Sequence, residues 1–270
     1  MGYHTKERLP SHIAVMYLCS AFRQAGGKRK IRVNLPYVLS ISESCLTCRL
    51  RSEGFFCSLP RPALEAFERI KFASSYPAGA VVFYEGHAPR GIFVLCQGQA
   101  KLSTGREDGR KMIIRIAKPG EILGLHAAVT GDPHEMTVET MQPCQLNFVK
   151  TPDFLEFMKE YSAAFLNAAK RLSHDFKAAQ GLIRSIGLSR STAERLARLL
   201  LESSVEARGD DGVSRVTLAL THEEISQLIG TSREAVTRTL SDFKKKGVAE
   251  LKGATLIIRN RAGLEELVPS

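Results

Sequence analysis

The segment Leu220–Leu251, "LTHEEISQLIGTSREAVTRTLSDFKKKGVAEL", constrains the fold more than any other part of the chain. Thr221 with Glu224, and Thr231 with Glu234, each have the T-x-x-E spacing of a capping box, in which two side chains satisfy the free N–H groups at a helix start. A glycine lies between the two boxes, where a sharp turn is needed. The sequence therefore predicts two helices joined by a tight turn.

Both predicted helices carry apolar residues on one face, at intervals of three or four. These residues are Ile225, Leu228, Ile229, Val236, Leu240 and Phe243. The other face of the second helix carries polar side chains that suit base recognition, because a guanidinium can bond guanine O6 and N7 together and a carboxylate can accept from cytosine N4. We predict that the DNA-binding residues are Arg233, Glu234, Thr237, Arg238, Thr231, Ser232 and Lys252. The alternative is that Glu234 only caps its helix and that Lys244–Lys246 only offset the helix dipole.

The net charge of +10 also favours an acidic partner, most simply double-stranded DNA. Half of that excess lies in residues 1–44, which we predict to be a flexible basic tail. The apolar run Ile13–Phe22 is interrupted by Ser20 and lacks a clear cleavage site, and no stretch approaches the ~20 apolar residues of a membrane span. We therefore expect a cytoplasmic protein with no membrane partner.

Nine of the 21 glycines lie between Gly79 and Gly131, among short β-branched and aromatic runs. This spacing predicts several strands joined by turns, and Asp108-Gly109 suits a hairpin because it tolerates positive φ. The region is typical of a barrel or jelly roll.

After Pro152 the apolar period becomes helical. Steps of four and three connect Phe165, Ala169, Leu172, Phe176, Ala179, Ile183 and Ile186. Such a narrow seam on a charged helix predicts a parallel homodimer through these residues. The alternative is a helix that packs only within its own chain.

Catalytic motifs are missing from the sequence. The seven histidines show no H-E-x-x-H or zinc-finger spacing, and there is no G-x-S-x-G and no P-loop. We therefore predict that the protein is not an enzyme.

Three of the six cysteines, Cys45, Cys48 and Cys57, lie within thirteen positions. Thiolates this close can hold an iron–sulfur cluster or zinc, or stay free, and disulfides are disfavoured in a cytoplasmic DNA binder. Cys96 alternates with Ile92 and Val94, which is typical of a small buried core residue. Cys19 lies in the tail and is assigned no role.

The order of these parts, together with "SREAVTRTL", resembles the CRP/FNR transcription regulators from about Cys45 to Leu267. The resemblance implies an α+β fold with a cyclic-nucleotide-binding-like β-roll (jelly roll), a long dimerisation helix and a C-terminal winged helix-turn-helix. The predicted parts are a basic tail at 1–44, a cysteine-rich loop at 45–60, the β-roll at 61–157, the dimerisation helix at 158–187 and the DNA-binding domain at 188–270.

By the same resemblance, Arg233, Glu234 and Arg238 read a palindrome with TGTGA or TTGA-type arms, and RNA polymerase is a partner. Members that bind cyclic AMP grip its phosphate with an Arg-Ser pair. Met136 and Thr137 stand there in this chain, so a buried phosphate would lack its cation and cAMP is not expected as the ligand.

FNR-like members place three N-terminal cysteines and a fourth in the roll around a 4Fe-4S cluster. The resemblance implies that Cys45, Cys48, Cys57 and Cys144 hold this cluster, which oxygen or nitric oxide would dismantle to release the dimer. The eight residues between Cys48 and Cys57 exceed the gap of the best-known pattern. The alternatives are zinc, free thiols, or a regulator of the same family that responds to another small effector, to haem or to nitric oxide.

Overall fold

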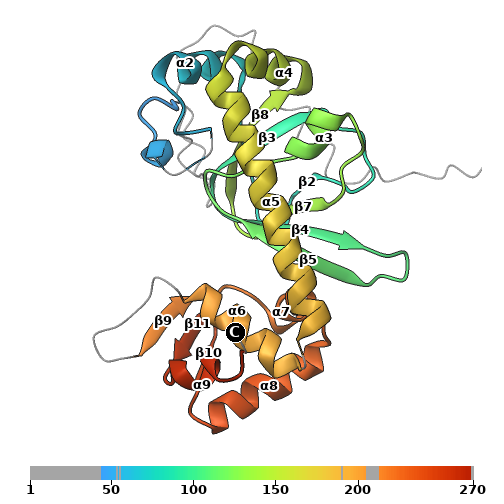
Figure 1. Cartoon of the computed structure of the whole chain (residues 1–270), viewed down its shortest axis with the longest axis vertical. Coiled ribbons are helices and arrows are strands. Elements are labelled where there is room, and N and C mark those ends of the chain that lie inside the picture. Colours follow the sequence, from blue (N-terminus) through green and yellow to red (C-terminus); the bar gives the residue numbers. More distant parts are fainter. Residues whose placement is uncertain (1–43, 53, 55, 190, 205–212, 269–270) are drawn as a thin grey trace, which may run out of the picture. The chain divides into compact units, whose positions relative to one another are not determined.

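The computed structural model of the chain describes residues 44–52, 54, 56–189, 191–204 and 213–268 (Figure 1). The predicted basic tail, with Cys19, lies outside the described residues apart from Ser44. No described helix is long and apolar enough to cross a membrane.

The N-terminal part contains two four-stranded antiparallel sheets, which confirms the predicted β-roll. The first sheet has the order β1 (Phe72–Tyr76), β8 (Cys144–Lys150), β3 (Gly91–Gln97), β6 (Ile122–Leu123). The second has the order β2 (Val81–Phe83), β7 (Thr137–Thr140), β4 (Ala100–Gly105), β5 (Lys111–Ala117). The predicted hairpin joins β4 and β5, and Gly109 at its turn has φ of 85°, in the left-handed region that favours glycine.

Alternate residues of β3 and β8 point to opposite faces of the first sheet, as the strand period of two requires. Leu95 and Leu146 point into a core shared with the second sheet, where they pack with Leu102 and Val138. Ile92, Val94 and Val149 lie instead in a second core on the outer face of the first sheet.

Helices and a loop cover that outer face (Figure 1). They are the loop from Ser44 to Pro60 with its short helix η1 (Arg49–Ser52), α2 (Arg61–Ile70) and α4 (Thr151–Glu160). Phe56, Leu64, Phe67 and Phe154 belong to this outer core, and Phe56 lies against the rings of Phe67 and Phe154. A further short helix, α3 (Leu125–Thr130), follows β6.

The long helix α5 runs from Ser162 to Leu188 and starts after a break at Tyr161, later than the predicted residue 158. Ala164, Ala168 and Arg171 are its buried residues.

The C-terminal part confirms the predicted winged helix-turn-helix. Its elements are α6 (Thr192–Ser203), β9 (Ser214–Thr217), α7 (His222–Ile229), α8 (Arg233–Lys245), β10 (Ala249–Lys252), β11 (Thr255–Ile258) and α9 (Arg261–Glu265). Strands β10 and β11 form the wing and make a three-stranded sheet with β9, a strand that the sequence analysis did not identify.

One of the two predicted capping boxes is confirmed. Thr221 and Glu224 make both reciprocal bonds at the start of α7. The second prediction is wrong, because α8 is capped by Ser232, whose hydroxyl accepts from the Ala235 N–H at 3.2 Å. The Thr231 hydroxyl lies instead 3.2 Å from that of Thr192 on α6.

Candidate functional site

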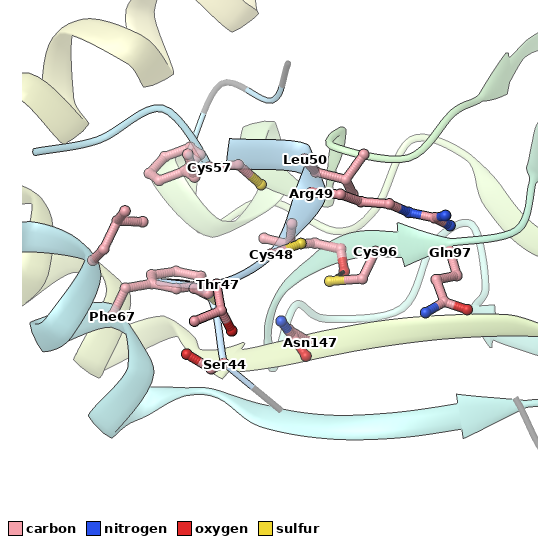
Figure 2. Close-up of a pocket in the computed structure, with 14 residues that line it drawn as sticks. Ser44, Thr47, Cys48, Arg49, Leu50, Cys57, Phe67, Cys96, Gln97 and Asn147 are labelled. Atoms are coloured by element: carbon pink, nitrogen blue, oxygen red, sulfur yellow. Dashed lines mark hydrogen bonds between the residues drawn. The ribbon is translucent and has the colours of Figure 1, made fainter. Parts of the chain in front are cut away.

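A cavity of about 270 Å³ lies between the cysteine-rich loop and the outer face of the first sheet. The thiols of Cys45, Cys48, Cys57 and Cys96 all line it. Figure 2 shows Cys48, Cys57 and Cys96 around this space, the first two from the loop and the third from β3. The structure therefore brings the three predicted loop cysteines together with a fourth thiol, which was expected to be a core residue.

Cys144 does not line this cavity. It is fully buried in the core between the two sheets, and its thiol lies 3.3 Å from the Gln99 carbonyl oxygen and 3.2 Å from that of Gln142. The reason is strand alternation, since Cys144 shares the face of β8 that carries Leu146, away from the loop. This placement does not support the expectation that Cys144 completes the thiol set.

Among the described residues, no three His, Cys, Asp or Glu side chains lie close enough together to hold a single metal ion. A tetrahedral zinc site needs all four sulfurs at about 2.3 Å from one centre.

Burial makes these thiols poor acids. It raises the pKa of Cys57 to about 12, with a smaller contribution from the negative charges that Cys45 and Cys48 would carry. It likewise raises the pKa of Cys96 to about 12, and the neighbouring thiols Cys57 and Cys45 add to the effect. Without a positively charged ligand, both thiols stay protonated at neutral pH.

Lys71 and Asn147 belong to this site although the sequence analysis did not single them out. Lys71, just after α2, places its ammonium 3.3 Å from the Cys45 sulfur and partly offsets the effect of burial on the pKa of that thiol. Asn147 on β8 lines the cavity, is 1% exposed, and its Oδ1 has no hydrogen-bond partner among the described residues. An unpaired buried amide is costly, which indicates a space that takes up a polar group. Asn147 reaches the cavity through the pairing of β8 with β3, whereas Lys71 reaches Cys45 because the loop packs against the end of α2.

An ion-pair network connects the roll to α5. Arg171 of α5, with a side chain only 3% exposed, donates to the Glu121 carboxylate at 2.7 Å and pairs with Asp175 at 2.8 Å. Arg115 of β5 also pairs with Glu121. Burial favours a higher pKa for Glu121, but the Arg115 and Arg171 charges outweigh it and hold the pKa below its usual range.

The positions that would grip a cyclic phosphate hold no cation. Met136 packs against the core between the sheets. The Thr137 hydroxyl accepts from the Glu85 N–H at 3.0 Å.

The candidate DNA-reading side chains lie on one exposed face of α8. Arg233, Glu234, Thr237 and Arg238 are all exposed, whereas Val236, Leu240 and Phe243 are buried, as expected. Bonds to its own N–H and to the Ser232 hydroxyl hold the pKa of the Glu234 carboxyl below its usual range.

His222, which the sequence analysis did not select, also contacts this face. Its Nδ1 lies 2.9 Å from the Thr237 hydroxyl, which itself donates to the Arg233 carbonyl at 3.0 Å. On the wing, exposed Lys252 lies 3.3 Å from the Glu250 carboxylate. The structure thus brings the predicted reading residues together on one helix.

The predicted dimer seam remains uncovered in the single chain. Phe165, Phe176 and Ile183 are 62%, 67% and 71% exposed. Ala169 and Ala179 are also exposed, whereas Leu172 and Ile186 are half-buried. Apolar side chains at this exposure along one helix are typical of an interface.

Two protein families match the chain. Residues 73–161 match the cyclic nucleotide-binding domain, and residues 194–267 match the Crp-like helix-turn-helix domain. A CRP-like cAMP-activated global transcriptional regulator of Mycobacterium tuberculosis is 26% identical over 214 residues, covering 77% of this chain and 93% of that protein.

The transcriptional activator protein FnrL of Cereibacter sphaeroides is 26% identical over 240 residues, covering 84% of this chain and 92% of that protein. The structure of FixK2 from Bradyrhizobium japonicum has the same fold, with a TM-score of 0.65 and 21% identity over 74% of this chain and 98% of that one.

A β-roll followed by a long helix and a winged helix-turn-helix defines a class of DNA-binding transcription regulators. Within that class, the chain belongs to the CRP/FNR family. Its relatives are transcription regulators and not enzymes, which is consistent with the lack of catalytic motifs.

Proposed function

We propose that this CRP/FNR regulator senses oxygen or redox state through a 4Fe-4S cluster bound in the cysteine-lined cavity. The observation that supports this most is the gathering of four thiols around one small space next to the roll. Four thiolates are the usual ligands of such a cluster. The cavity, at about 270 Å³, is also below the roughly 300–1,000 Å³ of pockets for drug-sized organic ligands.

The residues around the cavity fit a compact anionic group. Cys45, Cys48 and Cys57 supply three thiolates from the loop. Lys71 at 3.3 Å from the Cys45 sulfur provides a positive charge, while Phe56 and Phe67 shield the space from water. When bound, the cluster supplies iron–sulfur bonds that oxygen attacks.

The proposed signal passes through the outer core. Cys45 and Cys96 pack against the same hydrophobic cluster that includes Ala164 and Ala168 of α5. A change in the conformation of the loop would therefore affect the packing of α5, the helix that carries the dimer seam. We propose that a filled cavity fixes the loop and favours the paired, DNA-competent form.

In that form two copies of α8 would face successive major grooves of a palindrome with TGTGA or TTGA-type arms. Arg233, Glu234 and Arg238 would contact bases, and Lys252 the phosphate backbone. Relatives named as transcription regulators support DNA binding and dimer formation. A cytoplasmic location and RNA polymerase as a further partner remain part of this proposal, as the family resemblance implies. The lack of a cation beside Met136 and Thr137 argues against cAMP as the effector.

The test is chemical analysis of the full chain purified without oxygen. We expect about four iron and four acid-labile sulfide per chain, with a visible absorption band, all lost when air is admitted. Colourless protein, or protein with zinc in place of iron and sulfide, would contradict the proposal.

A further inference from the structure

We propose that Cys96 of β3, and not Cys144, is the fourth thiolate of the cluster site. This inference rests on the proposed cluster, and it names the one ligand that the loop cannot supply. The supporting observation is that Cys96 lines the cavity with all three loop cysteines, whereas Cys144 lies in a different core.

The first sheet separates the two candidates. On β3, Cys96 follows Ile92 and Val94 on the face covered by the loop. On β8, Asn147 shares that face, whereas Cys144 points the opposite way. Side chains of successive residues in β8 alternate between faces, so Cys144 cannot reach the side of the loop without a shift in the register of that strand.

Local backbone geometry also favours Cys96. The pairing of β3 with β8 is regular from Gly91 to Leu95 and then shifts, so that Gln97 pairs with Gln145 and Cys96 has no paired residue there. An extra residue of this kind re-aims a side chain and is common beside functional sites. The shift in strand register therefore falls at Cys96, the residue that we propose as the fourth ligand of the cluster.

Cys144 is held where it is by close packing. Besides its contacts with the Gln99 and Gln142 carbonyl oxygens, its sulfur lies only 2.5 Å from the place that a Cβ on Gly98 would occupy. Gly98 itself has φ of 88°, so the turn beside Cys144 suits glycine and leaves little room for movement. Bringing Cys144 to the loop would require dismantling this turn.

The four cysteines line one space, as the ligands of a cluster would. A 4Fe-4S core takes one thiolate at each of four irons, so its ligands surround a space and do not meet at one centre. On binding, four S–H bonds are replaced by four Fe–S bonds and four protons leave to solvent. Lys71 and the exposed Arg49, which also lines the cavity, offset the negative charge that results.

Two matched variants of the full chain test the assignment. Cys96→Ala and Cys144→Ala are each purified without oxygen and reconstituted with ferrous iron and sulfide beside the unaltered protein. We expect Cys144→Ala to bind iron and sulfide like the unaltered chain, and Cys96→Ala to lose more than about tenfold in cluster affinity, since even outer partners of a metal site contribute that much. Circular dichroism checks that both variants fold. If Cys144→Ala does not fold, Cys144→Ser takes its place, because a serine hydroxyl can keep the contacts with the two carbonyl oxygens.

A second readout uses the unaltered chain. Alkylation with iodoacetamide, followed by mass spectrometry, is compared between cluster-loaded protein and protein whose iron has been removed anaerobically by a chelator. We expect Cys96, which is only half-buried, to be protected together with the three loop cysteines while the cluster is bound, and to react slowly at alkaline pH once iron is removed. Cys144 stays unreactive in both forms because it is fully buried.

The possible failures are distinct. Iron and sulfide binding by Cys96→Ala together with its loss in Cys144→Ala would overturn this inference and leave the cluster proposal standing. The inference would also be overturned if both variants bound iron and sulfide equally well, or if both folded and lost the cluster to the same extent. If the unaltered chain binds no cluster, the proposed function fails and this inference fails with it.

Discussion

At the scale of single residues, the Glu121 carboxylate joins the roll to the long helix. It accepts from Arg171 of α5 at 2.7 Å and also pairs with Arg115 of β5. Because Arg171 is almost fully buried, its charge is compensated only while these partners stay in place.

We therefore expect Arg171→Met to lower the free energy of unfolding by about 3 kcal/mol, because it leaves a carboxylate that has lost its main buried partner. Urea denaturation measures this. Arg184→Met on the same helix is the control, since Arg184 is exposed and its loss should change stability by less than about 0.5 kcal/mol. Equal effects of both changes would contradict the structural role given to Arg171.

The ion pairs of Glu121 should also make the free energy of unfolding depend on pH. The pKa of Glu121 in the folded protein lies below its ordinary value of 4.5, so the charged form stabilises the fold above that pH. This contribution is lost as the pH falls below 4.5 and through the lowered folded-state pKa. Glu121→Gln should therefore be less stable than the unaltered chain at pH 7, and the difference should shrink in acid. A difference that stays constant down to pH 3 would contradict the argument.

At the scale of elements, we propose that different parts of α8 read bases and attract phosphates. Arg238 projects from the exposed face of the helix, whereas Lys245 lies at its C-terminal end. The two basic residues should therefore contribute to DNA binding in different ways.

We expect Arg238→Ala to cost about 1–3 kcal/mol on a cognate palindrome and to relax preference at one base pair of each arm. Lys245→Ala should instead weaken binding to all sequences alike and reduce its dependence on salt. Fluorescence anisotropy with a set of singly altered sites distinguishes the two outcomes. Sequence preference unchanged by Arg238→Ala would remove that residue from the reading face.

The long helix gives a second prediction. Phe176 is 67% exposed in the single chain, at the centre of the proposed seam. Phe176→Glu should weaken dimerisation by about tenfold or more, because a charge would have to be buried in the interface. Sedimentation equilibrium measures this, with Lys177→Glu as the exposed control outside the seam. Dimerisation unaffected by Phe176→Glu would favour the alternative that the helix packs only within its chain.

Several elements could be predicted from the sequence because local rules decide them. The capping box at Thr221 and the glycine turn at Gly109 depend on neighbours a few residues away. The start of α8 could not be predicted, since Thr231 and Ser232 can both cap a helix and a contact with Thr192 on α6 accompanies the choice. Strand β9 was missed because it has only four residues, and the ten-residue helix α2 was not identified from the sequence either.

Prediction of the cysteine site from the sequence was limited for the same reason. Alternation in β3 placed Cys96 on one face with Ile92 and Val94, and the structure agrees with that placement. Which face the loop covers depends on contacts between residues far apart in the chain, such as that of Lys71 with Cys45. The sequence could therefore identify the loop thiols as a group but not the strand residue that faces them.

At the scale of the whole molecule, three features of one chain are connected. The cysteine-lined cavity and the buried face of α5 share one hydrophobic cluster, the opposite face of α5 is apolar and exposed, and α8 exposes the side chains that we propose to read DNA. A change in the cavity can bias DNA binding only if it changes the population of paired helices.

The most direct measurement is the affinity of the full chain for a palindromic DNA site before and after air is admitted, with Cys45→Ala treated in the same way. The account predicts that the anaerobic, cluster-loaded protein binds as a dimer, that air weakens binding by about tenfold or more as the visible absorption disappears, and that Cys45→Ala binds weakly in both conditions. Equal affinity of the unaltered protein with and without oxygen, despite loss of the cluster, would contradict the central claim that the cavity controls DNA binding.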